Sequence, residues 1–130
     1  MFTLAYERRH NVLMARCTGV LSSQDIAELD QAVIAFTARD GPVHGLIDFS
    51  GLEAVTVPLS KLVQRGQQPA ISPGHKRVLV VPGPQGREFA AAFADQQVAA
   101  GSGGITIVSS LAEAYRLLNL PSEARFESVG

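Results

Sequence analysis

Two short apolar runs constrain the fold of this chain more than any other feature. Gly45–Ile47 and Val78–Val81 are apolar without the alternation that marks a strand with one exposed face. Such runs are typical of strands that are covered on both faces. A strand of this kind needs helices on both sides of its sheet, so the two runs predict an α/β fold.

The segments around these runs predict the order β-β-α-β-α-β-α-β-α. An opening hairpin is followed by strands that alternate with helices, which predicts a mixed, mostly parallel sheet of about five strands with right-handed crossovers and an N-terminal antiparallel hairpin. The expected strands cover residues 2–7, 12–18, 43–49, 77–81 and 105–108, and the expected helices cover residues 22–39, 58–66, 87–98 and 110–118. We expect one domain over residues 1–120 and a C-terminal tail over residues 121–130, loose from Phe126 onward.

The first expected helix carries local signals at both ends. Ser22 can cap its start, with Asp25 as the reciprocal acceptor of a capping box. At its end, Gly41 can adopt positive φ and Pro42 cannot continue a helix. The apolar residues at helical spacing predict one buried stripe, made of Ile26, Leu29, Val33 and Phe36.

Composition and charge exclude several classes of function. The 130 residues are 46% hydrophobic and 18% charged, which is typical of a folded globular domain. A net charge of -1 argues against general nucleic-acid binding, which needs a basic excess. No apolar run approaches the ~20 residues of a membrane span, and the start lacks the basic-then-apolar order of a signal peptide. Cys17 is the single cysteine, so no internal disulfide can form, and a cytoplasmic location is expected.

The end of the third expected strand carries polar residues where open α/β sheets bind ligands. Asp48 and Ser50 lie there, and with His44 they resemble the residue types of a hydrolase triad. However, His44 lies near the start of the same strand, more than ~10 Å away in an extended chain, and no Gly-x-Ser-x-Gly elbow is present. We therefore expect Asp48 to accept hydrogen bonds from the following turn and to take no part in catalysis.

A glycine turn follows the second apolar run. Gly83, Gly86 and Arg87 form a candidate anion-binding turn, because backbone N–H groups at a helix start can hold an anion. The lysine and hydroxyl of a P-loop and the third glycine of a dinucleotide fingerprint are missing, and no cofactor is expected. A tight turn with glycine at positive φ is the favoured alternative.

The histidines and the cysteine predict neither a metal site nor a reactive thiol. His10, His44 and His75 are isolated and lack paired ligand spacing, so no metal is expected. Cys17 lies in an expected strand, where an inert buried thiol is typical.

Four features of the chain carry a resemblance to a known family. They are the hairpin end at Gly19–Asp25, the strand end at Ile47–Phe49, the strand at Val78–Val81 and the helix start at Ser110–Ala114. Together they resemble the STAS domains of sulfate transporters and anti-sigma-factor antagonists, and in particular their SpoIIAA-like (STAS/Sec14-like) branch. The resemblance spans about residues 2–120 and implies a SpoIIAA-like fold.

The resemblance also implies a switch that this chain lacks. In the antagonists of this family, the loop after the third strand carries Asp-Ser-Ser/Thr-Gly, and phosphorylation of one serine changes partner binding. Thr56-Val57-Pro58-Leu59 stands in that place here, so the acidic residue, both serines and the glycine are replaced. Thr56 and Ser60 are nearby hydroxyls, for which a capping or surface role is commoner than phosphorylation.

These observations favour a non-enzymatic protein-interaction or regulatory module with an unidentified protein partner. Its expected surface is the loop and short helix at Ser50–Gly66, which includes Gly51, Lys61 and Arg65, beside the turn at Gly83–Arg87. Whether the chain forms a homodimer is left open.

Two other classes of function are kept as alternatives. One is a binder for a small anionic or lipid-like molecule, which the Sec14-like resemblance implies and for which the alanine-rich helix at 87–98 leaves room. A pocket lined by Phe49, Leu59, Leu62 and Phe89 would support it. The other is an enzyme of unknown type with a perturbed acid or base near Asp48.

Overall fold

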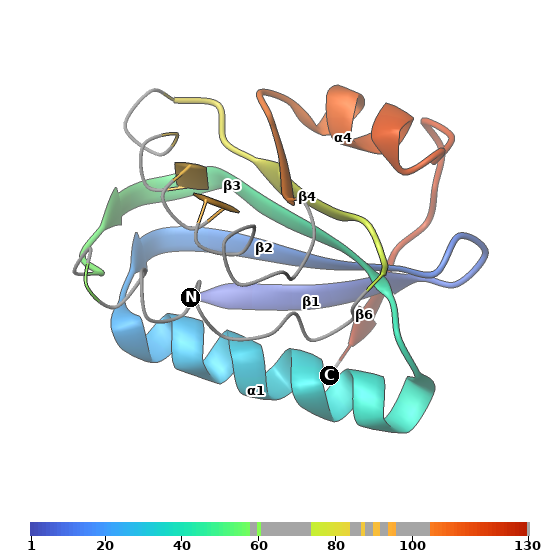
Figure 1. Cartoon of the computed structure of the whole chain (residues 1–130), viewed down its shortest axis with the longest axis horizontal. Coiled ribbons are helices and arrows are strands. Elements are labelled where there is room, and N and C mark those ends of the chain that lie inside the picture. Colours follow the sequence, from blue (N-terminus) through green and yellow to red (C-terminus); the bar gives the residue numbers. More distant parts are fainter. Residues whose placement is uncertain are drawn as a thin grey trace.

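The computed structural model describes residues 1–57, 60, 74–83, 87, 90–91, 94–95 and 105–129. The strands are β1 (Phe2–Glu7), β2 (Val12–Leu21), β3 (His44–Val55), β4 (Arg77–Val80), β5 (Ile105–Val108) and β6 (Glu127–Val129), and the helices are α1 (Ser23–Asp40) and α4 (Leu111–Leu117). The strands form one sheet in the order β5-β4-β3-β2-β1-β6, with α1 on one face and α4 on the other (Figure 1).

The pairing of the strands confirms the mixed, mostly parallel sheet. β2, β3, β4 and β5 run parallel to one another, and β1 is antiparallel to both β2 and β6. The sheet has six strands instead of about five, because Glu127–Val129 pairs with β1 and is not part of a loose tail. This pairing occupies the outer edge of β1, and the side chain of Val129 packs partly buried against the core beneath α1.

Helix α1 begins and ends where its local signals predict. The Ser22 side chain accepts a hydrogen bond from the Asp25 backbone, and the Asp25 carboxylate accepts one from the Ser22 backbone, which completes the capping box. At the other end Gly41 has φ 91° and donates its N–H to the carbonyl of Thr37. Leu29 and Phe36 of the predicted stripe are buried.

The two faces of the sheet carry separate cores, because successive side chains of a strand point to opposite faces. The core beneath α4 includes Val12, Met14, Leu46, Val78, Val80, Val108 and Ala114. The core beneath α1 includes Leu4, Leu13, Ala15, Cys17, Leu29 and Phe36. The central strands are therefore covered on both sides along Leu46 and Val78–Val81, as their apolar runs predict.

The two other expected helices, at 58–66 and 87–98, lie mostly outside the described residues. Those that are described in these segments are helical: Ser60, Arg87, Ala90, Ala91, Ala94 and Asp95. Among the described helices, none is long and apolar enough to cross a membrane.

Candidate functional site

Strands β2 and β3 extend together past the rest of the parallel sheet. β4 pairs only with Gly45–Asp48 of β3, whereas β3 continues along β2 as far as Val55. We call Thr18–Leu21 of β2 and Ser50–Val55 of β3 the β2–β3 ribbon. Among its apolar residues, Val20 is 47% exposed and Val55 is 37% exposed, on opposite faces. Val20 pairs with the exposed Ala54, whereas Val55 pairs with Leu21, which is buried beneath α1. The ribbon is therefore an exposed, partly apolar surface at the carboxyl ends of these strands.

β3 extends farther than the sequence predicts. Asp48 was expected at the end of the strand and Ser50 in the loop after it, but both lie within β3, as does Gly51. Arg16 lies opposite Asp48 and Thr18 opposite Gly51, so β3 contains one extra residue at this point, and a second register shift follows at Gly19. Serine and glycine are poor strand formers, and here the long pairing with β2 overrides their local preference.

Asp48 is held at the first register shift by two hydrogen bonds. Its Oδ1 accepts the backbone N–H of Ser50 at 2.9 Å, which confirms that this carboxylate accepts from the residues that follow it. Its Oδ2 accepts from Nε of Arg16 at 3.2 Å. The Asp48 side chain is 1% exposed, whereas that of Arg16 is 49% exposed. A buried carboxylate thus fixes one edge of an exposed guanidinium.

Arg16 was not among the residues selected from the sequence. It lies 32 positions from Asp48 along the chain, so no local spacing links the two. The sequence does contain one indication of its role: Arg16 is the single charged residue inside the otherwise apolar segment Val12–Cys17. Because a charge in a central strand needs a partner, that position could have been marked as one half of an ion pair.

Gly51 allows β2 and β3 to approach closely. A Cβ atom at this position would lie 3.0 Å from Cγ2 of Thr18 and 3.3 Å from the carbonyl oxygen of Cys17. Any larger residue would therefore push the two strands of the ribbon apart.

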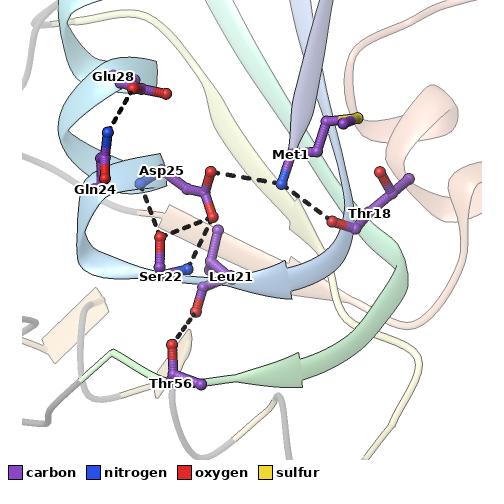
Figure 2. A network of polar contacts seen from close by, with 8 residues as sticks. All are labelled: Met1, Thr18, Leu21, Ser22, Gln24, Asp25, Glu28 and Thr56. Atoms are coloured by element: carbon purple, nitrogen blue, oxygen red, sulfur yellow. Dashed lines mark hydrogen bonds and ion pairs between the residues drawn. The ribbon is translucent and has the colours of Figure 1, made fainter.

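Thr56 joins the end of β3 to the end of β2. Its backbone N–H and its hydroxyl both donate to the carbonyl of Leu21, at 2.8 Å and 3.2 Å. Figure 2 shows this contact beside the α1 cap, where the N-terminal ammonium of Met1 lies 3.5 Å from Oδ1 of Asp25. Hydrogen bonds from the backbone and side chain of Ser22 hold the pKa of Asp25 below its usual range, and the ammonium adds to this effect. The Thr56 hydroxyl is therefore engaged in tying β3 to β2.

The other residues of the expected Ser50–Gly66 surface are only partly placed. Ser60 is exposed and helical. Lys61 and Arg65 lie outside the described residues, so their proposed role stays a prediction.

The candidate anion-binding turn is also partly placed. Gly83 is not among the glycines with positive φ, so the turn does not require glycine at this position for its backbone conformation. Its carbonyl accepts the N–H of Arg87 at 3.3 Å, and Nη2 of Arg87 donates to Oγ of Ser109, just past β5. Arg87 is thus directed toward the end of β5, and Gly86 lies outside the described residues.

The histidines are not isolated, which corrects the sequence interpretation. His44 and His75 have ring centroids 4.9 Å apart, and Nδ1 of His44 accepts the backbone N–H of Lys76 at 2.9 Å. Burial, together with the nearby His75 and Lys76, lowers the pKa of His44. His10 donates its backbone N–H to the buried carboxylate of Glu7 at 2.8 Å. Within the described ranges, no three His, Cys, Asp or Glu side chains are grouped as metal ligands would be.

Cys17 is a buried thiol, as expected. Its side chain is 0% exposed in the core beneath α1. Burial raises the pKa of the Cys17 thiol to about 11, and the charges of Asp25 and Asp48 act in the same direction. The thiol is therefore protonated and shielded at neutral pH.

An apolar cavity of about 130 Å³ lies between α1 and the sheet. Its lining includes Ala15, Leu29, Val33, Gly45 and Leu79, with Asp30 and Arg77 as charged members. Phe49, expected to line a ligand pocket, is not part of it, and the other three residues of that expected pocket lie outside the described part of the chain.

Comparisons with known proteins agree on the fold. A structure of the anti-sigma factor antagonist SpoIIAA in its unphosphorylated form matches with a TM-score of 0.59 and 14% identity, over 92% of this chain and 98% of its own. The chain has the SpoIIAA-like fold. An uncharacterised DUF3478-family protein from Shewanella loihica, also SpoIIAA-like, matches with a TM-score of 0.53 and 17% identity, over 91% of this chain and 92% of its own.

No protein-family model matches the chain, and no curated protein matches it. The structural matches confirm the predicted resemblance to the STAS domains at the level of the fold. At 14% and 17% identity, they carry no residue roles to this chain.

Proposed function

We propose that this SpoIIAA-like domain is a non-enzymatic protein-interaction module that regulates a protein partner, and that the partner docks on the β2–β3 ribbon. The observation that carries the proposal is the exposure of Val20 and Ala54, which pair directly and lie on the same face of two adjacent strands. Apolar residues that lie side by side on one exposed face can form part of a patch that another protein covers. The fold match to an anti-sigma factor antagonist, a protein that acts on another protein, supports the same class of function.

The switch that the family resemblance implies is not part of this proposal. Thr56 stands in place of the acidic residue of that motif, and its hydroxyl already donates to the carbonyl of Leu21. Phosphorylation of Thr56 would remove this hydrogen bond and place negative charge near Asp25, so we propose regulation by docking instead. A cytoplasmic location and a non-enzymatic role stay predictions, and a second copy of the chain is one of the partners that the test can reveal.

The test is photo-crosslinking in the native host from a light-activated amino acid placed at Ala54, which pairs with Val20. The matched control places the same residue at Ile34, which is 52% exposed on α1. We expect one reproducible protein adduct from position 54, none from position 34, and loss of the adduct when Val20→Asp is added. Equal labelling from both positions would contradict the proposed surface.

A small-ligand binder is the second candidate, and the cavity beneath α1 favours it. Apolar cavities of roughly 150 Å³ stay dry and can bind a molecule the size of benzene. Native mass spectrometry of the protein purified from its own host would show a retained ligand, and Ala15→Val, which adds two methyl groups to the cavity lining, should release it. A bare mass for the wild-type protein would count against this candidate.

A further inference from the structure

We propose that Arg16 is the residue through which the β2–β3 ribbon recognises a carboxylate side chain of its protein partner. This inference rests on the proposed interaction function and specifies the chemistry of that partner. It assigns a recognition role to Arg16 and a positioning role to Asp48.

Arg16 is oriented before any partner arrives. Its Nε donates to Oδ2 of Asp48 at 3.2 Å, and Oδ1 of the same carboxylate is occupied by the N–H of Ser50 at 2.9 Å. Asp48 is 1% exposed and cannot turn toward solvent without breaking both bonds. The guanidinium is therefore held in one direction, which lowers the entropy that binding would otherwise cost.

The outer edge of this guanidinium is available. Arginine has five N–H donors, and the bond to Asp48 uses the one on Nε. The side chain is 49% exposed, and its Nη groups make no hydrogen bond within the described part of the chain. Two parallel N–H groups on the outer edge match the two oxygens of a carboxylate.

The position of Arg16 in the sheet directs this edge toward a docking partner. Met14, two residues earlier on β2, is buried in the core beneath α4, whereas Thr18, two residues later, is exposed. Thr3, opposite Arg16 on β1, is also exposed. Arg16 therefore lies where the cover of α4 ends and the exposed ribbon begins. A partner that covers Val20 would bring its polar rim to the guanidinium.

The charge balance selects a carboxylate over a phosphate. Asp48 already offsets the single positive charge of Arg16, and the flanking Thr3 and Thr18 add none. A phosphate group carries ≈ −1.5 to −2 charge and generally needs a cluster of cations. A carboxylate carries a single charge and needs one guanidinium edge.

The experiment selects ligands for the immobilised full chain from a library of random linear peptides. Affinity is then measured by fluorescence polarisation for the wild type, for Arg16→Lys and for the double variant Arg16→Gln/Asp48→Asn. Lysine keeps the charge beside Asp48 but lacks the planar fork, and the double variant leaves no buried charge unpaired. Urea unfolding of each variant verifies that it is folded.

We expect the selected peptides to be enriched in aspartate or glutamate and to bind both variants at least about tenfold more weakly than the wild type. Changing the acidic peptide residue to its amide should cause a similar loss. Peptides that bind wild type and both variants equally, yet fail on Val20→Asp, would overturn the role of Arg16 and leave the proposed surface intact. Tighter binding of phosphoserine in place of the acidic residue would overturn the carboxylate assignment. If no peptide binds the ribbon, both proposals fail.

Discussion

At the scale of single residues, Gly51 is the position where the ribbon tolerates least change. The space for a Cβ is limited by Cγ2 of Thr18 at 3.0 Å and by the carbonyl of Cys17 at 3.3 Å, and only the threonine side chain can rotate away. We expect Gly51→Ala to lower the free energy of unfolding by about 1–3 kcal/mol, as overpacking does. Urea unfolding measures this. Gly83→Ala is the matched control, since a Cβ there meets nothing within 4 Å, and equal stability of both variants would contradict the close approach.

His44 gives the chain a pH-dependent stability term. Its pKa is lowered in the folded state, so over the pH range just below its ordinary value near 6.5 the unfolded chain binds more protons than the folded one. The contribution of His44 is therefore complete above that value and is lost as the pH falls through the lowered pKa. We expect His44→Asn, whose side-chain oxygen can lie where Nδ1 accepts the N–H of Lys76, to lose less unfolding free energy than the wild type between pH 7.5 and pH 5.5. An identical decrease in both proteins would show that the histidine does not contribute.

At the scale of elements, the start of α1 depends on one hydroxyl. Oγ of Ser22 accepts the N–H of Asp25 at 3.2 Å and donates to Oδ2 of the same residue at 2.9 Å, which positions the carboxylate that faces the N-terminal ammonium. We expect Ser22→Ala to cost about 1 kcal/mol of unfolding free energy. Ser23→Ala, one residue into the helix and exposed, is the control and should be near neutral. Thermal unfolding followed by circular dichroism compares the two, and equal melting temperatures would show that the cap contributes nothing.

The same elements show what local sequence can and cannot predict. The Ser22 cap, the helix end at Gly41 and the apolar strand at Val78–Val80 are set by neighbouring residues, and the structure has them as predicted. The length of β3 and the pairing of β6 are set by strands far away in the chain, which supply the partners for Ser50–Val55 and Glu127–Val129. Local propensity therefore predicted a loop after Phe49 and a loose tail at Glu127–Val129.

The candidate site was harder to predict for the same physical reason. Asp48 was selected because a strand end was predicted there, and its partner Arg16 is brought to it only by the parallel pairing of β2 with β3. The crossover through α1 separates the two residues along the chain, and no motif records their contact.

At the scale of the whole molecule, Cys17 reports on global unfolding. It lies in β2, a central strand, with no exposed surface and a thiol pKa of about 11. A thiol reagent can reach it only after the sheet opens, so we expect no reaction in buffer at pH 8 and complete reaction in denaturant. The reaction rate in increasing urea, measured by absorbance, should follow the loss of circular dichroism. Rapid labelling of the native protein would contradict a closed core beneath α1.

The pairing of β2 with β3 also has a consequence for the order in which the protein folds. β1, β2, α1 and β3 are consecutive, so the first 55 residues contain the longest strand pair and the helix that covers it. Forming a contiguous unit of this kind closes shorter loops than pairing β4 and β5 with it. Such units often form first and open last. Amide hydrogen exchange should therefore be slowest along β2 and the first half of β3, with β5 exchanging through a smaller opening that leaves this unit intact.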